Sequence, residues 1–165
     1  MNDKNMLFNT ASSIAVLYHH KQVDKAGLPY ILHPMAVATM VENIEERIVA
    51  MLHDTIEDTD LTLDILEHVY DFPKWVLDAV DAITNRKDEK EPLDDYLDRV
   101  KANPIAFAVK LKDIEHNRSE RRLSYLGLDV QKRLRKKYRY CVQYLYARWN
   151  HIENLTIFYK LYKYL

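Results

Sequence analysis

The sequence predicts an all-α fold in a single domain. Helical spacing of apolar residues dominates the 165-residue chain, and 48% of its residues are hydrophobic, enough to bury one core. Only two glycines occur, and no segment shows a convincing strand pattern. Because no Gly/Ser-rich linker divides the chain, we expect one domain over residues 1–165, with a core at about 6–120 and a C-terminal helical extension at about 129–165.

The first two helices are expected on either side of a loop. Apolar residues at helical spacing predict a helix over Met6–Tyr18. Gly27 and Pro29 are helix breakers and predict a loop over Lys21–Pro29. Pro34 fits the first turn of the next helix, where a backbone N–H has no intrahelical partner.

The later helices are predicted from apolar spacing and from residues that favour helix starts. Asp60 or Thr62 is the expected cap of a short helix that runs to Tyr70, and Asp129 is the expected cap of the long C-terminal helix. The charged stretch Thr84–Glu91 is expected to be a loop. The other expected helices are Glu45–Glu57, Pro73–Ile83, Pro92–Ala102, Pro104–Asn117, Val130–Trp149 and His151–Leu165.

Composition argues against several classes of protein. Lys and Arg number 24 and Asp and Glu number 25, so the chain lacks the strongly basic balance of a nucleic-acid-binding protein. The single cysteine, Cys141, excludes an internal disulfide framework and suits a reducing cytoplasm. No apolar run approaches the roughly 20 residues of a membrane span, and no apolar signal core follows the N-terminus. We expect a cytoplasmic protein with no nucleic-acid or membrane partner.

Two histidines and two aspartates are candidate ligands of one divalent metal ion. His33 ends the segment PYILH before a proline, His53 and Asp54 open HDTIEDT, and Asp113 lies in KLKDIEHNRS. Each residue taken alone also fits a surface or helix-entry role. Together they supply mixed nitrogen and oxygen ligands from separate helices, which is how metal sites in helical bundles are built.

A second pair of acids follows the candidate ligands. Glu57 and Asp58 lie one helical turn beyond His53 and Asp54, so each acid is expected to share a face with a ligand. Carboxylates beside a metal can hold a water molecule and deprotonate it. The pattern predicts a metal-dependent hydrolase of phosphate esters or anhydrides, with His116 supporting the ligands.

Substrate binding must come from side chains, because the chain has no Gly-rich phosphate loop. Arg86 and Lys87 follow a predicted helix and could reach substrate phosphates, although a solvated charged loop fits them equally well. Arg118 is a further candidate. Asn117 lies one turn past Asp113, so its amide is expected to point into the same cavity.

These segments together resemble the HD-domain hydrolases of the RelA/SpoT type. The resemblance extends from about Leu17 to Ser119, and HDTIEDT matches the central motif of the family in full. It implies an HD-domain helical bundle that removes the 3′-pyrophosphate from (p)ppGpp with Mn²⁺. By motif position it implies metal binding by His33, His53, Asp54 and Asp113, catalysis by Glu57 and Asp58, and nucleotide binding by Asn117.

One departure from the family concerns the base of the nucleotide. Many members carry Arg-Lys before the PYILHP segment, and the arginine packs against guanine. In this chain Asp24 takes the place of the arginine, followed by Lys25, which we expect to contact the substrate. An aspartate cannot stack on a purine as a guanidinium does. Another nucleotide or dinucleotide phosphate is therefore an alternative substrate to ppGpp.

A non-catalytic function is the remaining alternative. The chain would then be a metal-stabilised nucleotide-binding module whose Tyr-rich C-terminal part forms an interaction surface. For either function, the Tyr-rich C-terminal helices are a candidate surface for a homo-oligomer. The acid pair favours an enzyme, because a structural metal needs only its ligands. The basic and aromatic run Lys132–Tyr146 is interpreted as a helix with one basic and one packing face. The chain length predicts a small stand-alone hydrolase without a synthetase domain.

Overall fold

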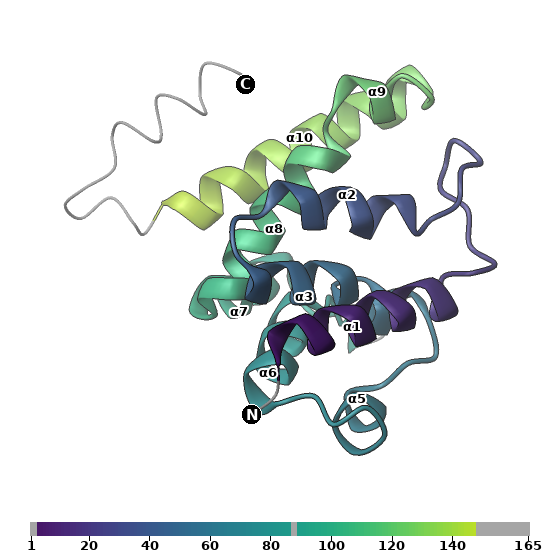
Figure 1. Cartoon of the computed structure of the whole chain (residues 1–165). Coiled ribbons are helices and arrows are strands. Elements are labelled where there is room, and N and C mark those ends of the chain that lie inside the picture. Colours follow the sequence, from purple (N-terminus) through teal and green to yellow (C-terminus); the bar gives the residue numbers. More distant parts are fainter. Residues whose placement is uncertain (1–2, 87–88, 148–165) are drawn as a thin grey trace.

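The protein is described by a computed structural model that covers residues 3–86 and 89–147 (Figure 1). These residues form α-helices joined by short connections, which confirms the all-α prediction. The helices are α1 (Lys4–Tyr18), α2 (Leu32–Met40), α3 (Ile44–Leu52), α4 (Thr55–Asp58), α5 (Leu63–His68), α6 (Lys74–Ile83), α7 (Leu93–Ala102), α8 (Pro104–Asn117), α9 (Glu120–Leu123) and α10 (Leu128–Tyr146).

Most of the predicted helix boundaries agree with the structure. The helix α8 has the predicted bounds, and Thr62 caps α5 by accepting a hydrogen bond from the Ile65 N–H at 3.2 Å. The predicted loop before α2 is confirmed, and it carries an isolated antiparallel bridge between Val23 and Pro29. The predicted helix His151–Leu165 and the end of the helix predicted to reach Trp149 lie outside the described residues.

The prediction of one continuous helix over residues 45–57 is wrong. The helix breaks at His53 and Asp54, which separate α3 from α4. His53 Nδ1 and the Thr55 hydroxyl each donate a hydrogen bond to the carbonyl oxygen three residues earlier, at 2.8 and 2.7 Å. These side-chain donors satisfy carbonyls at the end of α3, so the chain turns there without leaving them unpaired. The turn brings both candidate ligands to one side, whereas adjacent residues of a straight helix lie about 100° apart.

Two features near the C-terminal end also differ from expectation. Gly127 is the N-cap of α10, so the prediction that Asp129 caps this helix is wrong. Asp129 lies in the first turn, where its carboxylate favours the helix through the positive end of the helix dipole. The four-residue helix α9 was not expected, because an element of one turn shows no apolar periodicity.

The core consists of two hydrophobic clusters that meet along α8. The larger cluster unites α1, α2, α3 and α6, and α8 contributes Ala106 and Val109 to it. The smaller cluster lies between α7, α8 and α10 and includes Ile114 of α8. In Figure 1, α1, α2 and α3 lie side by side and α8 passes behind them. Because α8 is fixed on both sides, the position of its C-terminal turn is well determined.

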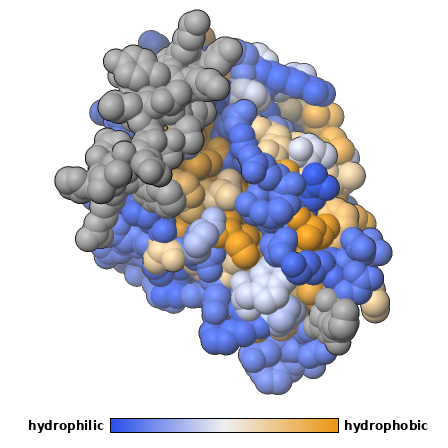
Figure 2. Space-filling view, turned by 60° about the vertical axis from the view of Figure 1, so that its left-hand side comes forward, coloured by the Kyte–Doolittle hydropathy of each residue, from blue (hydrophilic) through white to orange (hydrophobic). Residues whose placement is uncertain are grey.

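The outer helix α10 has the two faces that its sequence predicts. Tyr138 and Tyr144 pack on the smaller cluster, and the ring of Tyr146 meets Phe107 at 6.0 Å. On the face of the molecule seen in Figure 2, hydrophilic side chains predominate and apolar ones lie scattered between them. Among the described residues, none of the helices combines the length and apolar character that a membrane crossing requires. The three tyrosines beyond residue 147 lie outside the described part.

Candidate metal centre

The four predicted metal ligands come together although they lie on different elements. His33 is in the first turn of α2, His53 and Asp54 form the turn after α3, and Asp113 is in the last turns of α8. The two Nε2 atoms are 3.2 Å apart, and Asp113 Oδ1 is 3.2 Å from His33 Nε2 and 3.8 Å from His53 Nε2. Asp54 Oδ2 is 3.0 Å from His53 Nε2 and 3.4 Å from His33 Nε2. Two ligand atoms about 2.1 Å from one ion are about 3.0 Å apart at right angles and about 4.2 Å apart on opposite sides, so the spacing fits a divalent metal.

The hydrogen bonds of His53 leave its Nε2 free to bind a cation. Its Nδ1 faces the carbonyl oxygen of Ala50, which only accepts hydrogen bonds, so Nδ1 must carry the proton. Nε2 is then the atom at which the ring takes up either a second proton or a metal ion. It is buried and points at a second imidazole nitrogen and at carboxylate oxygens. Lone pairs that face one another need a shared cation.

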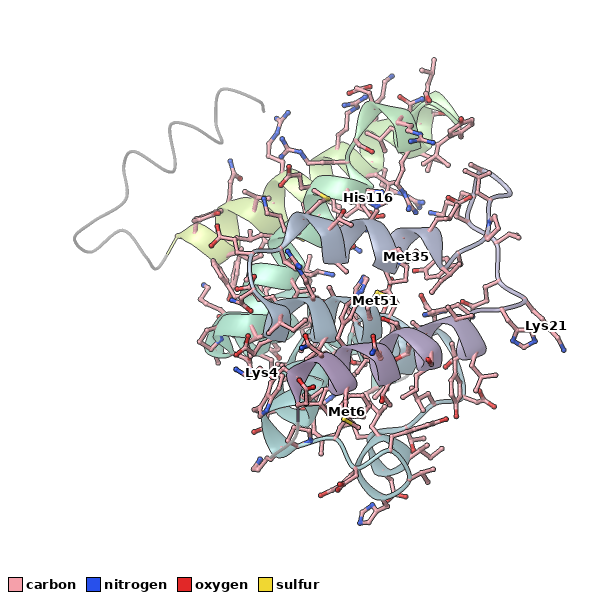
Figure 3. The ribbon with its side chains drawn as sticks, viewed as in Figure 1. Lys4, Met6, Lys21, Met35, Met51 and His116 are labelled. Atoms are coloured by element: carbon pink, nitrogen blue, oxygen red, sulfur yellow. The ribbon has the colours of Figure 1, made fainter. Side chains whose placement is uncertain are left out.

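His33 is held in the same tautomer by a chain of contacts through His116. His116 Nδ1 lies 3.5 Å from an Arg122 nitrogen, which only donates, so this Nδ1 is an acceptor. His33 Nδ1, at 2.7 Å from the same atom, must then be the donor, and its Nε2 is bare. Burial, His33 and Arg122 lower the pKa of His116 to about 4, so His116 remains a neutral acceptor near pH 7. This arrangement agrees with the expected supporting position of His116, whose place at the end of α8 is labelled in Figure 3.

The cluster attracts positive charge. Burial opposes protonation of His53, but Asp54 and Asp113 outweigh it and raise the pKa of His53 well above its usual value. Without a metal ion, a proton therefore occupies Nε2, and a bound cation would displace it. Burial favours the neutral form of Asp54, yet His53 and His33 hold its pKa well below the usual range. The carboxylates are therefore ionised at neutral pH, as metal ligands must be.

Lys110 fixes the orientation of Asp113. Its ammonium group donates to Asp113 Oδ2 at 2.8 Å, while Oδ1 faces the two histidines and accepts a hydrogen bond from the Asn117 amide. Burial opposes the charge of Lys110, but Asp113 and Tyr96 outweigh burial and raise the pKa of Lys110 well above its usual value. Lys110 is not among the predicted site residues, although its position one turn before a candidate ligand was the available signal.

Tyr30 was also missed, although it precedes His33 by three residues. Its hydroxyl donates to Asp54 Oδ2 at 2.6 Å and lies 3.3 Å from Asp58 Oδ2. Burial and the carboxylate of Asp54 raise the pKa of Tyr30, so the phenol keeps its proton and remains a donor. Tyr30 thus connects a metal ligand to one member of the acid pair.

The acid pair lies on α4, directly after the ligand turn. Glu57 Oε2 accepts a hydrogen bond from the Asn85 N–H at 3.0 Å, which ties it to the loop after α6. Asp58 faces the Tyr30 hydroxyl, and its carbonyl oxygen accepts a 2.6 Å hydrogen bond from the Gln22 amide. The two carboxylates are therefore held by different segments on either side of α4.

The loop that contains Arg86 is braced from α7. Arg99 donates to both oxygens of Glu91, at 2.7 and 2.6 Å, and to the carbonyl oxygens of Asp81 and Thr84. One guanidinium nitrogen of Arg86 donates to both carboxylate oxygens of Asp81, at 3.0 and 3.2 Å. Its substrate contact stays a prediction, and a phosphate would have to compete with Asp81. Lys87 lies outside the described residues.

The loop before α2 gives Asp24 a structural function. The Asp24 carboxylate accepts hydrogen bonds from the N–H groups of Ala26 and Leu28, at 2.8 and 3.0 Å, in a turn where Gly27 has φ 78°. Asp24 and glycine are residues that such a turn favours. Lys25 is exposed on this loop, and Arg118 is half-buried at the end of α8, so the substrate contacts of both remain predictions.

The comparisons with known proteins point in one direction. No family model matches the chain. It is 30% identical over 132 residues to the bifunctional (p)ppGpp synthase/hydrolase SpoT of Escherichia coli, covering 72% of this chain and 18% of that protein. It is 29% identical over 139 residues to a guanosine-3′,5′-bis(diphosphate) 3′-pyrophosphohydrolase of Borreliella burgdorferi, covering 76% of this chain and 20% of that one. The chain thus spans about a fifth of these relatives.

A further relative and a solved structure agree. A probable GTP pyrophosphokinase of Mycobacterium leprae is 31% identical over 118 residues, 65% of this chain and 15% of that protein. A solved metazoan SpoT orthologue superposes with a TM-score of 0.71 at 22% identity, covering 84% of this chain and 85% of that one.

The fold and the cluster define an all-α domain of the HD type. Ligand atoms of His33, His53 and Asp113 lie within 4.8 Å of one another, and Asp54 lies beside the two histidines. The chain belongs to the HD-domain proteins of the RelA/SpoT type, as its motifs predict.

Proposed function

We propose that this protein is a metal-dependent nucleotide phosphohydrolase that releases pyrophosphate from ppGpp-like nucleotides. One observation carries the proposal. Two imidazole Nε2 atoms lie 3.2 Å apart, and each of two ionised carboxylates lies 3.0–3.8 Å from both nitrogens, beside a second acid pair that need not bind the ion. A purely structural metal site would need only the four ligands.

The four ligand residues would hold the ion, and His116, Lys110 and Tyr30 would fix three of them. A divalent metal bound there lowers the pKa of a water molecule and polarises a phosphoryl group. Mixed nitrogen and oxygen ligands suit Mn²⁺, which we propose as the natural ion, although such donor sets accept several first-row metals.

The acid pair would act on water and on the leaving group. Glu57, held by the Asn85 N–H, is placed to orient a water molecule and accept its proton. Asp58, held near the Tyr30 hydroxyl, is placed to keep that water in line or to return a proton to the leaving group. Asn117 is already engaged with Asp113, so its contact to the nucleotide would use its remaining amide atoms.

The substrate class is inferred from the relatives. Two of them carry names that include hydrolysis of guanosine-3′,5′-bis(diphosphate), and we propose that the activity extends to this chain, in the cytoplasm. The alternative is a related nucleotide or dinucleotide phosphate. Asp24 favours this alternative, because the residue that would stack on guanine is replaced and its carboxylate is used inside the loop.

The first experiment measures phosphate and pyrophosphate release from ppGpp and from a nucleotide panel, using metal-stripped protein reloaded with Mn²⁺. We expect pyrophosphate from ppGpp. Asp54→Ala should lose metal binding and turnover, whereas Glu57→Ala should bind metal and turn over about 10²–10⁴-fold more slowly. His68→Ala is the control, because His68 is an exposed histidine paired with Asp64.

Three outcomes separate the alternatives. If the protein hydrolyses another nucleotide but not ppGpp, the proposed metal chemistry stands and the proposed substrate is wrong. Full activity of Asp54→Ala would refute the metal site. Tight nucleotide binding without turnover under every metal tested would favour the non-catalytic module.

A further inference from the structure

Arg122 differs from the other well-placed arginines of the molecule. Arg86, Arg99 and Arg135 each bind a carboxylate. Arg122, half-buried on α9, has one hydrogen-bond contact among the described residues, a long one of 3.5 Å to the neutral ring of His116. No carboxylate of the described chain neutralises its guanidinium group.

A half-buried guanidinium group without a carboxylate partner favours binding of an anion. Partly removing a charge from water costs free energy unless a partner of opposite charge and good hydrogen bonds compensate. A guanidinium has five N–H donors in a planar fork that matches the oxygens of a phosphate. A single long contact to an imidazole leaves most of these donors available.

The position of Arg122 decides which anion fits. Arg122 and His33 Nδ1 both contact His116 Nδ1, at 3.5 and 2.7 Å. The guanidinium group is therefore within about 9 Å of His33 Nε2, because only these two contacts and the width of the His33 ring separate them. A phosphate at the metal would contact the ligand side of His33, whereas Arg122 lies behind its other nitrogen.

We propose that Arg122 binds a second phosphate group of the substrate, one separated from the reacting phosphate by roughly a ribose. The ligand class is a nucleoside phosphorylated at both its 3′ and 5′ positions. Arg122 would then select doubly phosphorylated nucleotides over singly phosphorylated ones. This inference rests on the proposed function for the position of the reacting phosphate.

The charges around Arg122 support an anion at this place. Arg121, exposed on the same short helix, and Arg118, at the end of α8, add positive charge nearby in the sequence. Glu120, the acid of the same helix, is bound by both guanidinium nitrogens of Arg135, at 2.7 and 2.8 Å. The acid closest in sequence is thus already occupied.

The test compares Arg122→Met with Arg121→Met, the matched control on the neighbouring exposed arginine. Two substrates are used, guanosine 3′,5′-bis(diphosphate) and guanosine 3′-diphosphate, which lacks the 5′ phosphates. Arg122→Met should raise KM for the first about 10–100-fold, the usual range for a hydrogen bond to a charged group. With Mn²⁺ at a saturating concentration, its KM for the second substrate should stay within about twofold of the wild-type value. Arg122→Lys should lie between Arg122→Met and the wild type.

Binding measurements separate this inference from the proposed function. Calorimetry with ppGpp and metal-stripped protein measures binding without turnover. Arg122→Met should lower the affinity for ppGpp by about the factor by which it raises KM. Arg121→Met should leave the affinity unchanged. If the wild type binds ppGpp without hydrolysing it, the proposed function fails and the Arg122 site stands. Equal losses for both substrates, or an unchanged affinity of Arg122→Met for ppGpp, would overturn the inference.

Discussion

Two lysines of α8 each pair with an acid about one turn further along the helix. One pair is buried and the other is exposed, so the free-energy cost of leaving a buried charge unpaired can be measured within one helix. Lys110 pairs with Asp113 and Lys112 pairs with Glu115, both at i,i+3 on α8 and at 2.8 and 2.9 Å. The side chains of the first pair are 18% and 6% exposed, and those of the second are 36% and 50% exposed. The two pairs therefore have the same spacing and nearly the same length, and they differ in how deeply they are buried.

We expect Lys110→Met to lower the free energy of unfolding by about 3 kcal/mol in metal-stripped protein. Removing one partner of a buried ion pair costs about 3–5 kcal/mol, because the other charge is left uncompensated. The lower end applies, since Asp113 keeps the Asn117 amide and the two imidazoles nearby. Methionine fills most of the space of the lysine stem, so the cavity contribution is small. Lys112→Met should cost at most about 0.5 kcal/mol, as is usual for exposed pairs.

The assay is urea and thermal unfolding of both variants in EDTA at pH 7. For a chain of this size, 3 kcal/mol corresponds to a fall in Tm of about 6–12 °C. If the two variants lose the same stability within about 1 kcal/mol, burial does not strengthen the Lys110 pair and the argument that Lys110 fixes Asp113 fails.

Three further changes test separate contacts. Tyr30→Phe removes the hydroxyl that donates to Asp54 and should weaken Mn²⁺ binding about 10-fold with an unchanged helical circular dichroism spectrum, measured by calorimetry. Arg99→Met should cost about 2–3 kcal/mol at pH 7. Hydrogen bonds from Arg99 hold the pKa of Glu91 below its ordinary 4.5, so this stability is present above pH 4.5 and lost as pH falls further. The Arg99→Met deficit should therefore shrink at pH 3 in urea titrations. Asp24→Ala should lose about 1 kcal/mol and Asp24→Asn little, because asparagine keeps the acceptor.

Much of the candidate metal centre was predictable because its residues lie in short motifs with the chemistry of a cation site. The spacing of His53, Asp54, Glu57 and Asp58 carries that chemistry in one segment, and helical periodicity located α8 and with it Asp113. The break between α3 and α4 was not predictable in this way. It depends on side chains donating to carbonyls three residues back, and apolar periodicity does not register such contacts.

The supporting residues were missed for a different reason. Lys110, Tyr30 and Arg122 are ordinary residues for a helix or a loop, and their function depends on contacts to residues on other elements or one turn away. Arg122 and His116 are separated by a helix boundary, and His33 is more than 80 residues from His116. Contacts at such separations depend on how α2, α8 and α9 pack against one another. A local sequence pattern does not show this packing.

The chain from Arg122 through His116 to His33 connects two events at the proposed site. His33 can bind an ion through Nε2 only while Nδ1 keeps its proton, and His116 keeps it there by accepting a hydrogen bond. His116 remains an acceptor partly because Arg122 points a positive charge at it. A phosphate bound to Arg122 would reduce that charge, and an ion bound to His33 would strengthen the Nδ1–H donor. Binding of phosphate at Arg122 and binding of metal at His33 would therefore be coupled through the His116 ring, and by linkage each would change the affinity of the other by the same factor.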